Sequence, residues 1–235
     1  PNRFSARFAS GGTLPLRHAP RKLARMPAAP TPQALIVVDV QRGFCAGGAL
    51  AVPDGDAVVT VINLLARRFA DVVLTQDWHP PDHLSFASQH TGRAPFDHVE
   101  MPYGPQTLWP DHCVMDTESA AFHPSLNVPH AALVLRKGSR REVDSYSAFM
   151  EADRRTRTGL HGWLGERGIR AVTICGLATD FCVLWTALDA RALGYEVTVI
   201  EDACRGIDLA GSLDAAWAQM REAGIQRITS EDHRP

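Results

Sequence analysis

Cys182 stands where a nucleophile is expected, at the point where an apolar strand gives way to a helix. The residues from Val172 to Ile174 are mostly apolar and β-branched, and apolar residues recur at helical spacing from Phe181 onward. In the first turn of such a helix, unpaired backbone N–H groups and the positive end of the helix dipole favour a thiolate over a thiol. We therefore expect Cys182 to be more reactive than a free cysteine, whose pKa is about 8.5. The alternative is a buried cysteine that packs as a small hydrophobe.

Two further residues that follow apolar strands have the chemistry of a base and a cation. Asp39 follows the run from Leu35 to Val38 and has apolar neighbours, so burial is expected to raise its pKa towards that of a useful base. Lys137 follows the run from Leu133 to Leu135 and has the charge to stabilise a thiolate and orient the aspartate. The alternatives are an aspartate that organises the next turn and a solvated lysine at a strand end.

Taken together, these three residues have the composition of an activated-nucleophile site. Cys182 would attack a carbonyl group, Asp39 would act as its base and later as a proton donor, and Lys137 would be the electrostatic partner. The oxyanion formed on attack needs hydrogen-bond donors, and the backbone N–H groups of Ala178 and Cys182 are candidates. The sequence therefore favours covalent catalysis at a carbonyl group.

A second set of residues has the side chains of a metal site. Asp77 and His79 are two apart at an extended strand end, so their side chains point to the same side and can share one ion. A carboxylate with imidazoles suits Zn, Fe or Mn, and few protein ligands would leave positions open for water or substrate. Chance clustering is the alternative, because the chain has ten histidines. Further candidates nearby are His83, Ser85, Asp111, His112 and Cys113, of which the cysteine fits a packed core better.

Two aromatic residues beside these motifs, Phe44 and Trp109, have the shape to form the walls of a flat pocket for a ring. Aromatic residues near a strand edge are otherwise core residues. We expect the same pocket to be completed by Leu177, Ala178 and Tyr146.

Strands that alternate with helices position these residues. Such alternation predicts a doubly wound, three-layer α/β/α fold with a mainly parallel sheet of about six strands. Polar residues that follow parallel strands gather at one edge of the sheet, where ligands bind. The stretch 78–128 is rich in Pro, His and Gly and indicates an elaborated loop over that edge. Strands are expected at 35–38, 72–74, 133–135, 172–174, 197–200 and 225–228, and helices at 57–70, 159–167, 181–193 and 213–223, with Thr179 or Asp180 as cap of the third helix.

Composition limits the classes of function. The chain has 24 basic and 26 acidic residues, a net charge of −2, and no apolar run of the roughly 20 residues that a membrane-spanning helix needs. We therefore expect neither a membrane nor a nucleic-acid partner. Five cysteines without a Cys-x-x-Cys pair suit a reducing compartment, so a cytoplasmic location is expected.

The first 25 residues contain six basic residues and no acidic one. This composition is that of a transit peptide, a tag or an upstream-translated tail, and Met26 is a plausible true start. We expect residues 1–32 to be a disordered extension and residues 33–235 to form one globular domain that carries the candidate site.

Read in order, the motifs resemble those of the nicotinamidase/pyrazinamidase family, within the isochorismatase-like cysteine hydrolases. The resemblance runs from about Ala34 to near the C-terminus, and it implies an isochorismatase-like sheet with a Cys-Asp-Lys triad at Cys182, Asp39 and Lys137. The matching motifs are 38–45 (VDVQRGFC), 75–80 (TQDWHP), 83–88 (HLSFAS), 109–114 (WPDHCV), 137–138 (KG) and 178–183 (ATDFCV).

The resemblance also implies one divalent metal ion as cofactor, held by Asp77, His79 and His112. Zinc is the expected metal, with iron or manganese as the alternatives. His83 matches a position that ligates metal directly in some members, and Ser85 matches one that acts through water in others, so the fourth ligand stays open. A cis peptide is implied between Leu177 and Ala178.

The reaction that the resemblance implies is hydrolysis of nicotinamide to nicotinate and ammonia through a cysteine thioester, with pyrazinamide as a second substrate and a role in NAD salvage. Small molecules are the implied partners, and a homo-oligomer stays open. The rivals are a related hydrolase of carbamoyl or ureido groups or of isochorismate, and a silent scaffold. One departure is visible, because family members commonly have Asn-Asp or Pro-Asp where this chain has Arg42-Gly43.

Overall fold

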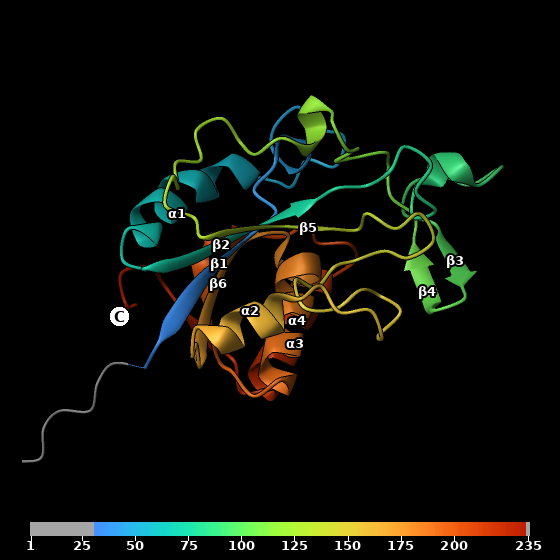
Figure 1. Ribbon diagram of the computed structural model, residues 1–235. Coiled ribbons are helices and arrows are strands. Elements are labelled where there is room, and N and C mark those ends of the chain that lie inside the picture. The colour runs from blue at the N-terminus through green and yellow to red at the C-terminus, as the bar shows by residue number, and fades with distance from the viewer. Residues whose placement is uncertain (1–30, 234–235) are drawn as a thin grey trace, which may run out of the picture.

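A six-stranded parallel sheet forms the centre of the molecule in the computed structural model, which describes residues 31–233. Its strand order is β5-β2-β1-β6-β7-β8 (Figure 1). All six strands expected from the apolar runs are present, so the prediction of the fold class is confirmed. The strands are β1 (Gln33–Val38), β2 (Asp71–Asp77), β5 (Leu133–Lys137), β6 (Ala171–Leu177), β7 (Glu196–Arg205) and β8 (Gln226–Ile228).

The central strand β1 explains both the sheet and the place of the site. Every residue from Ala34 to Val38 is buried, because helices cover both faces of a parallel sheet. β1 pairs with β2 on one side and with β6 on the other, through Val37 opposite Leu74 and Cys175. From β1 the chain adds β2 and then β5 on one side, and it later adds β6, β7 and β8 on the other side. This reversal makes a topological switch point at the carboxyl end of β1.

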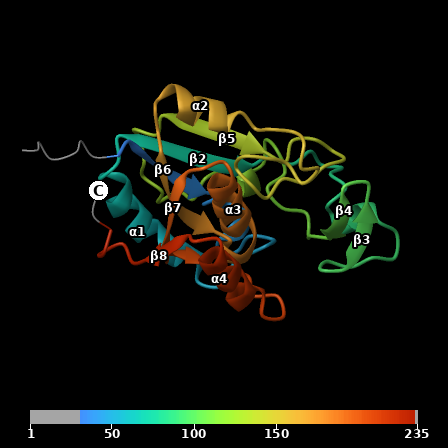
Figure 2. The same cartoon turned by 90° about the horizontal axis from the view of Figure 1, so that it is seen from below.

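The helices form the outer two layers (Figures 1 and 2). In Figure 1, α1 lies above the sheet, and the other three α-helices of residues 31–233 lie below it. This division follows from right-handed crossovers, since the chain moves one way along the sheet through α1 and the opposite way through the other three. The bounds are α1 (Val58–Ala66), α2 (Leu160–Glu166), α3 (Leu184–Ala192) and α4 (Ser212–Glu222).

The long connection between β2 and β5 is mostly loop, as expected, but it contains a hairpin that the sequence did not predict. Strands β3 (His98–Met101) and β4 (Gly104–Thr107) pair in antiparallel fashion and project from one end of the molecule (Figure 1). Each strand is only four residues long, so the alternation of polar and apolar residues in β3 is too short to stand out, and β4 contains Pro105 and no apolar alternation.

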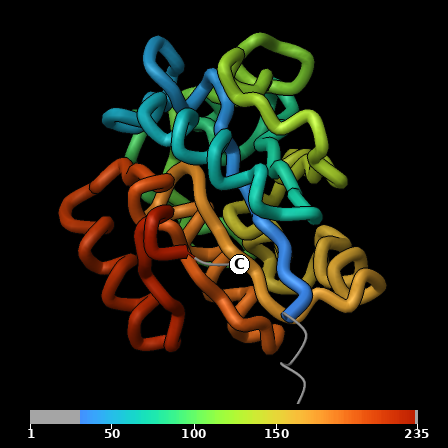
Figure 3. The backbone as a smooth tube through the Cα atoms, turned by 90° about the vertical axis from the view of Figure 1, so that its left-hand side faces the viewer, coloured from blue at the N-terminus to red at the C-terminus, as the bar shows by residue number. Residues whose placement is uncertain are grey.

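The beginning of β1 and the end of the described chain lie at the end of the molecule opposite the hairpin (Figure 3). The expected disorder of the N-terminal extension concerns residues 1–32, of which 1–30 fall outside the described residues. Within residues 31–233, none of the helices has the length and apolar character needed to cross a membrane.

Candidate active site

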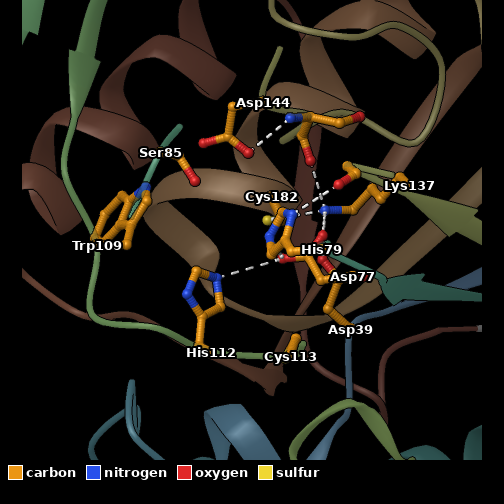
Figure 4. Close-up of polar contacts among 12 residues, drawn as sticks. Asp39, Asp77, His79, Ser85, Trp109, His112, Cys113, Lys137, Asp144 and Cys182 are labelled. Carbon is orange, nitrogen blue, oxygen red and sulfur yellow. Dashed lines mark hydrogen bonds and ion pairs between the residues drawn. The ribbon is translucent and has the colours of Figure 1, made fainter. Parts of the chain in front are cut away.

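Four neighbouring strands bring their carboxyl ends together at one edge of the sheet (Figure 4). Asp39 directly follows β1, Asp77 ends β2, Lys137 ends β5, and Cys182 lies in the turn after β6. All four side chains are buried. The strand-end residues predicted to gather therefore do so.

Lys137 lies at the centre of this group. Its Nζ is 3.4 Å from Cys182 Sγ and 2.9 Å from Asp39 Oδ2, and it donates hydrogen bonds to Asp77 Oδ1 and to the carbonyl oxygen of Ser145. Burial alone would lower the pKa of Lys137, but the two carboxylates outweigh burial and hold that pKa well above its usual value. The ammonium group therefore stays charged.

Asp39 has the environment of a base. Burial raises its pKa to about 6, although the charge of Lys137 opposes the shift. Thr75 Oγ1 donates a 2.6 Å hydrogen bond to Oδ1. Among the described residues, Oδ2 pairs with the Lys137 charge but accepts no well-aligned hydrogen bond, so it is free to receive a proton.

The Cys182 thiol differs from the expectation. Burial raises its pKa well above the ordinary value, Asp39 and Asp77 raise it further, and Lys137 lowers it only in part. The prediction of a depressed pKa is therefore wrong for this structure. The desolvation penalty of the buried thiolate is larger than the stabilisation that one ammonium group provides.

The turn that carries Cys182 also differs from the expected helix start. Residues Thr179–Val183 form a π-helical turn, and α3 follows from Leu184. Neither Thr179 nor Asp180 caps this turn with its side chain, so that prediction is wrong. The carboxylate of Asp180 instead accepts hydrogen bonds from the loop after β7. The peptide bond between Leu177 and Ala178 is cis, as the resemblance implies.

Asp77, His79 and His112 form a buried cluster beside Lys137 (Figure 4). The Nε2 atoms of His79 and His112 lie 3.6 and 3.9 Å from Asp77 Oδ2. Their Nδ1 atoms lie 2.8 Å from the carbonyl oxygens of Gly138 and Pro110, which places the protons on Nδ1 and leaves the Nε2 lone pairs facing Asp77. The donor set and its orientation therefore fit one divalent ion.

The electrostatics of the cluster support this fit. Burial would raise the pKa of Asp77, but Lys137, His79 and His112 outweigh burial and lower it. Burial lowers the pKa of His112 to about 4, so this imidazole is neutral at pH 7 and its lone pair is available, whereas Asp77 outweighs burial at His79 and raises the pKa of that ring. An anionic carboxylate beside a neutral imidazole is a suitable ligand pair.

His83 and Ser85, the two candidates for a further ligand, are hydrogen-bonded to each other. His83 Nδ1 lies 2.7 Å from Ser85 Oγ and 3.1 Å from the Ser85 backbone nitrogen, and its Nε2 lies 3.3 Å from the carbonyl oxygen of Val143. Direct ligation by His83 would break one of these bonds. Cys113 is buried and, as expected for a core cysteine, lies outside the cluster of ligand atoms.

Sequence reasoning assigned no role to Asp144 and Gln41. Asp144 is buried, and its carboxylate lies within 4.8 Å of ring nitrogens of His79 and His83 and accepts a 2.8 Å hydrogen bond from Gln106 Nε2. Gln41 bonds both the N–H and the carbonyl oxygen of Asp77, which fixes the end of β2 against the end of β1. Gln41 belongs to the first motif, whereas Asp144 follows no strand and carries no periodic signal.

A small cavity opens onto Cys182 and contains most of the predicted pocket residues. Trp109 stands edge-on to Phe181, with ring centroids 4.9 Å apart, and its Nε1 donates a 3.0 Å hydrogen bond to the Tyr146 hydroxyl. Leu177, which we expected in the pocket, is instead wholly buried in the core beneath the turn. The lining comprises the expected Phe44, Trp109, Tyr146 and Ala178, together with Leu50, Asp77, His112, Asp144, Phe181, Cys182 and Ile207.

The departure at Arg42-Gly43 has a steric explanation. A Cβ atom at Gly43 would lie 2.7 Å from Ser119 Oγ and 2.8 Å from Cys113 Sγ. The segment that follows His112 therefore packs against the backbone of Gly43, in space that a side chain there would need.

Comparison with known proteins defines the class first. Residues 33–232 match the family model of the isochorismatase domain. A nicotinamidase from Acinetobacter baylyi is 57% identical over 199 residues, which cover 85% of this chain and 93% of that protein. The solved structure of a nicotinamidase/pyrazinamidase from Acinetobacter baumanii has a TM-score of 0.85 and 58% identity, and the match covers 86% and 98% of the two chains. The chain therefore belongs to the nicotinamidase family of the isochorismatase-like hydrolases.

Two further solved structures contain ligands. The PnC1 protein from L. infantum, in complex with nicotinate, has a TM-score of 0.75 and 38% identity over 86% of this chain and 94% of that one. The pyrazinamidase of Pyrococcus horikoshii, in complex with zinc, has a TM-score of 0.69 and 35% identity, and the match covers 84% of this chain and 99% of that one.

Proposed function

We propose that this chain hydrolyses nicotinamide to nicotinate and ammonia in NAD salvage, and that it also deamidates pyrazinamide. The observation that carries the proposal is the contact of Lys137 with both Asp39 and Cys182, since Cys182 lines a pocket with aromatic walls. The nicotinamidase relatives and the neighbour in complex with nicotinate support the choice of substrate.

In the acylation half-reaction, Cys182 Sγ attacks the carboxamide carbon while its proton passes to Asp39 Oδ2. The high pKa of the buried thiol means that proton transfer accompanies the attack rather than preceding it. The backbone N–H groups of Ala178 and Cys182 would stabilise the oxyanion. Asp39 then returns the proton to the departing nitrogen, so that ammonia leaves and a thioester remains.

In the deacylation half-reaction, water attacks the thioester carbon and gives a proton to Asp39. The carbon–sulfur bond breaks, Asp39 returns the proton to Cys182, and nicotinic acid is released and loses its proton to solvent as nicotinate. A pKa near 6 lets one carboxyl group act as base and as acid in turn. Lys137 remains charged throughout and stabilises the negative charge that moves between Asp39 and Cys182.

Asp77, His79 and His112 would hold one divalent ion. Zinc is the preferred identity of this ion, and iron or manganese is the alternative. Its fourth protein contact would come from His83 or from Ser85 through water. When bound, the ion supplies a Lewis-acid contact for the pyridine nitrogen of the substrate. The zinc complex of the P. horikoshii neighbour supports this assignment.

The pocket residues then orient the ring. Phe44 and Trp109 would enclose its two faces, and Tyr146, fixed by the Trp109 indole, would limit its edge. In the same proposal, residues 33–235 form the catalytic unit, residues 1–32 take no part in hydrolysis, and the enzyme works in the cytoplasm on small molecules.

The test is ammonia release from nicotinamide by the purified, metal-loaded protein, beside the variants Cys182→Ala and Cys175→Ala. Cys175 is equally buried but lies in the core of β6, so it is a matched control. Activity that is lost in Cys182→Ala and kept in Cys175→Ala supports the proposal. Turnover retained in Cys182→Ala overturns the mechanism, and a folded wild-type protein without turnover redirects the search to carbamoyl or ureido substrates.

A further inference from the structure

The carboxylate of Asp180 connects the nucleophile turn to a loop that is distant in sequence. Asp180 is 4% exposed and lies two residues before Cys182. Its Oδ1 accepts a 2.9 Å hydrogen bond from the backbone N–H of Ile207, and its Oδ2 accepts one of 2.9 Å from Asp208 and another from Ser212 Oγ. Two donors of the loop after β7 and one from the first residue of α4 thus converge on one buried side chain.

The loop held in this way supplies part of the wall of the pocket. Ile207 lines the cavity that opens onto Cys182, and its own backbone N–H is one of the three donors. The position of this wall residue is therefore tied to the same turn that positions the nucleophile.

The backbone of this loop is strained. Asp208 and Ala210 have φ angles of 58° and 51°, in the left-handed region that is unfavourable for residues with a side chain. Such conformations persist only where surrounding contacts hold them. The hydrogen bonds that Asp180 accepts are contacts of this kind, because their donors Ile207 and Ser212 lie on either side of the strained residues and Asp208 is one of them.

Close packing beside Asp180 makes the arrangement specific. A Cβ atom at Gly206 would lie 3.1 Å from Asp180 Oδ1 and 2.7 Å from Leu213 Cδ1. The loop backbone therefore packs closely against the carboxylate, and a side chain at position 206 would have to displace Leu213.

We propose that Asp180 is a positioning residue for the substrate, because it holds Ile207 in the pocket wall and so limits the ring substituents that the site accepts. This inference rests on the proposed function, since it concerns the ring that enters the pocket beside Cys182. A neutral amide at position 180 has one acceptor oxygen and an NH2 group that would face a backbone N–H. Asp180→Asn therefore keeps the size of the side chain but loses at least one anchor of the loop.

The experiment compares kcat/KM for nicotinamide and for 5-methylnicotinamide in the wild type, Asp180→Asn, Ile207→Ala and the double variant. Both single variants are expected to raise the ratio of kcat/KM for 5-methylnicotinamide to kcat/KM for nicotinamide by about fivefold or more. A tight pocket can discriminate against one extra methyl group by at least this factor, and both variants relax the pocket wall. The double variant should add little to either single change, because both substitutions relax the same wall.

Asp189→Asn is the matched control. Asp189 is also 4% exposed and also holds a partner, the Arg154 guanidinium, but it lies on α3 outside the lining of the cavity. It is expected to lower stability without changing the ratio. Ser212→Ala removes one donor without altering the nucleophile turn, and a smaller shift in the same direction is expected even where Asp180→Asn fails to fold.

The outcomes separate the two claims. A wild-type enzyme that does not hydrolyse nicotinamide overturns the proposed function and this inference together. An active wild type whose ratio is unchanged by Asp180→Asn and Ser212→Ala, or changes equally in Asp189→Asn, overturns the inference alone.

Discussion

The ends of β1 and β2 carry the same residue type in similar surroundings, but their electrostatics differ. Asp39 and Asp77 are both buried, and both pair with the ammonium group of Lys137. Burial raises the pKa of Asp39 to about 6, whereas Lys137 and two histidines outweigh burial at Asp77 and lower its pKa. The end of β1 thus has a carboxyl group that can exchange protons near neutral pH, and the end of β2 has one that stays anionic.

The difference between the two pKa values comes from the groups that surround each carboxylate besides Lys137. Asp77 faces His79 and His112 in addition to Lys137, while Asp39 has Thr75 and the charge of Asp77, which raises its pKa further. Two carboxyl groups whose surroundings push their pKa values apart can divide acid–base work from electrostatic work. We therefore assign proton transfer to Asp39 and ion binding to Asp77, and the following experiments test this division.

The largest effect is expected from Asp39→Asn. The amide cannot accept the thiol proton, so kcat should fall by roughly 10²–10⁴-fold, the usual contribution of a general base. Metal content, measured by elemental analysis, should stay at the wild-type level. A variant that retains turnover but loses the ion would reverse the assignment of the two aspartates.

Asp77→Asn should act first on the ion. Loss of a partner that only orients a ligand already costs roughly 10–100-fold in metal affinity, so removal of the anionic ligand itself should cost on the order of 100-fold or more. The measurement is the free zinc concentration that half-saturates each protein, with Asp39→Asn as the matched control. Equal affinity in Asp77→Asn and the wild type would remove Asp77 from the metal site.

The pH profile tests the raised pKa of Asp39. The base must be deprotonated to accept the thiol proton, so activity is present above its pKa and is lost as the pH falls through about 6. We expect kcat/KM for nicotinamide to drop about tenfold per pH unit below that point. An acid limb near pH 4, the ordinary range of an aspartate, would contradict the effect of burial.

The smallest effect is expected where a similar ion pair is exposed. Arg227 and Glu201 form a two-bond pair with side chains 45% and 44% exposed. Because water already solvates both charges, Arg227→Ala should change the free energy of unfolding by less than about 1 kcal/mol and leave kcat unaltered. Urea unfolding is the measurement, and a loss as large as that in a Lys137→Ala variant would show that burial is not what distinguishes the two sites.

Much of the candidate site could be predicted because it depends on strand ends. Apolar runs located β1, β2, β5 and β6, and the carboxyl ends of parallel strands must meet at one edge. Asp39, Asp77 and Lys137 lie at or next to the ends of these strands, and Cys182 lies in the turn after β6, so their proximity was predictable without any knowledge of side-chain contacts.

The features that were missed depend on contacts between distant residues. The partners of Asp180 lie 27 to 32 positions later in the chain, so local sequence indicated a helix cap instead. The raised pKa of Cys182 reflects the depth of the thiol and the presence of two carboxylates, and a sequence pattern reports neither. Asp144 lies in an irregular loop, where no periodicity predicts burial.

The position of β1 between β2 and β6 has a consequence for synthesis of the chain on the ribosome. β2 follows β1 closely, but Cys175 of β6 is 139 positions from its contact Ile36 on β1. Until β6 has emerged, one side of an apolar strand has unpaired backbone groups, which is a hazard for aggregation. We therefore expect nascent chains that stop before residue 171 to bind chaperones more strongly than chains extended beyond β7, which a ribosome-stalling series can measure.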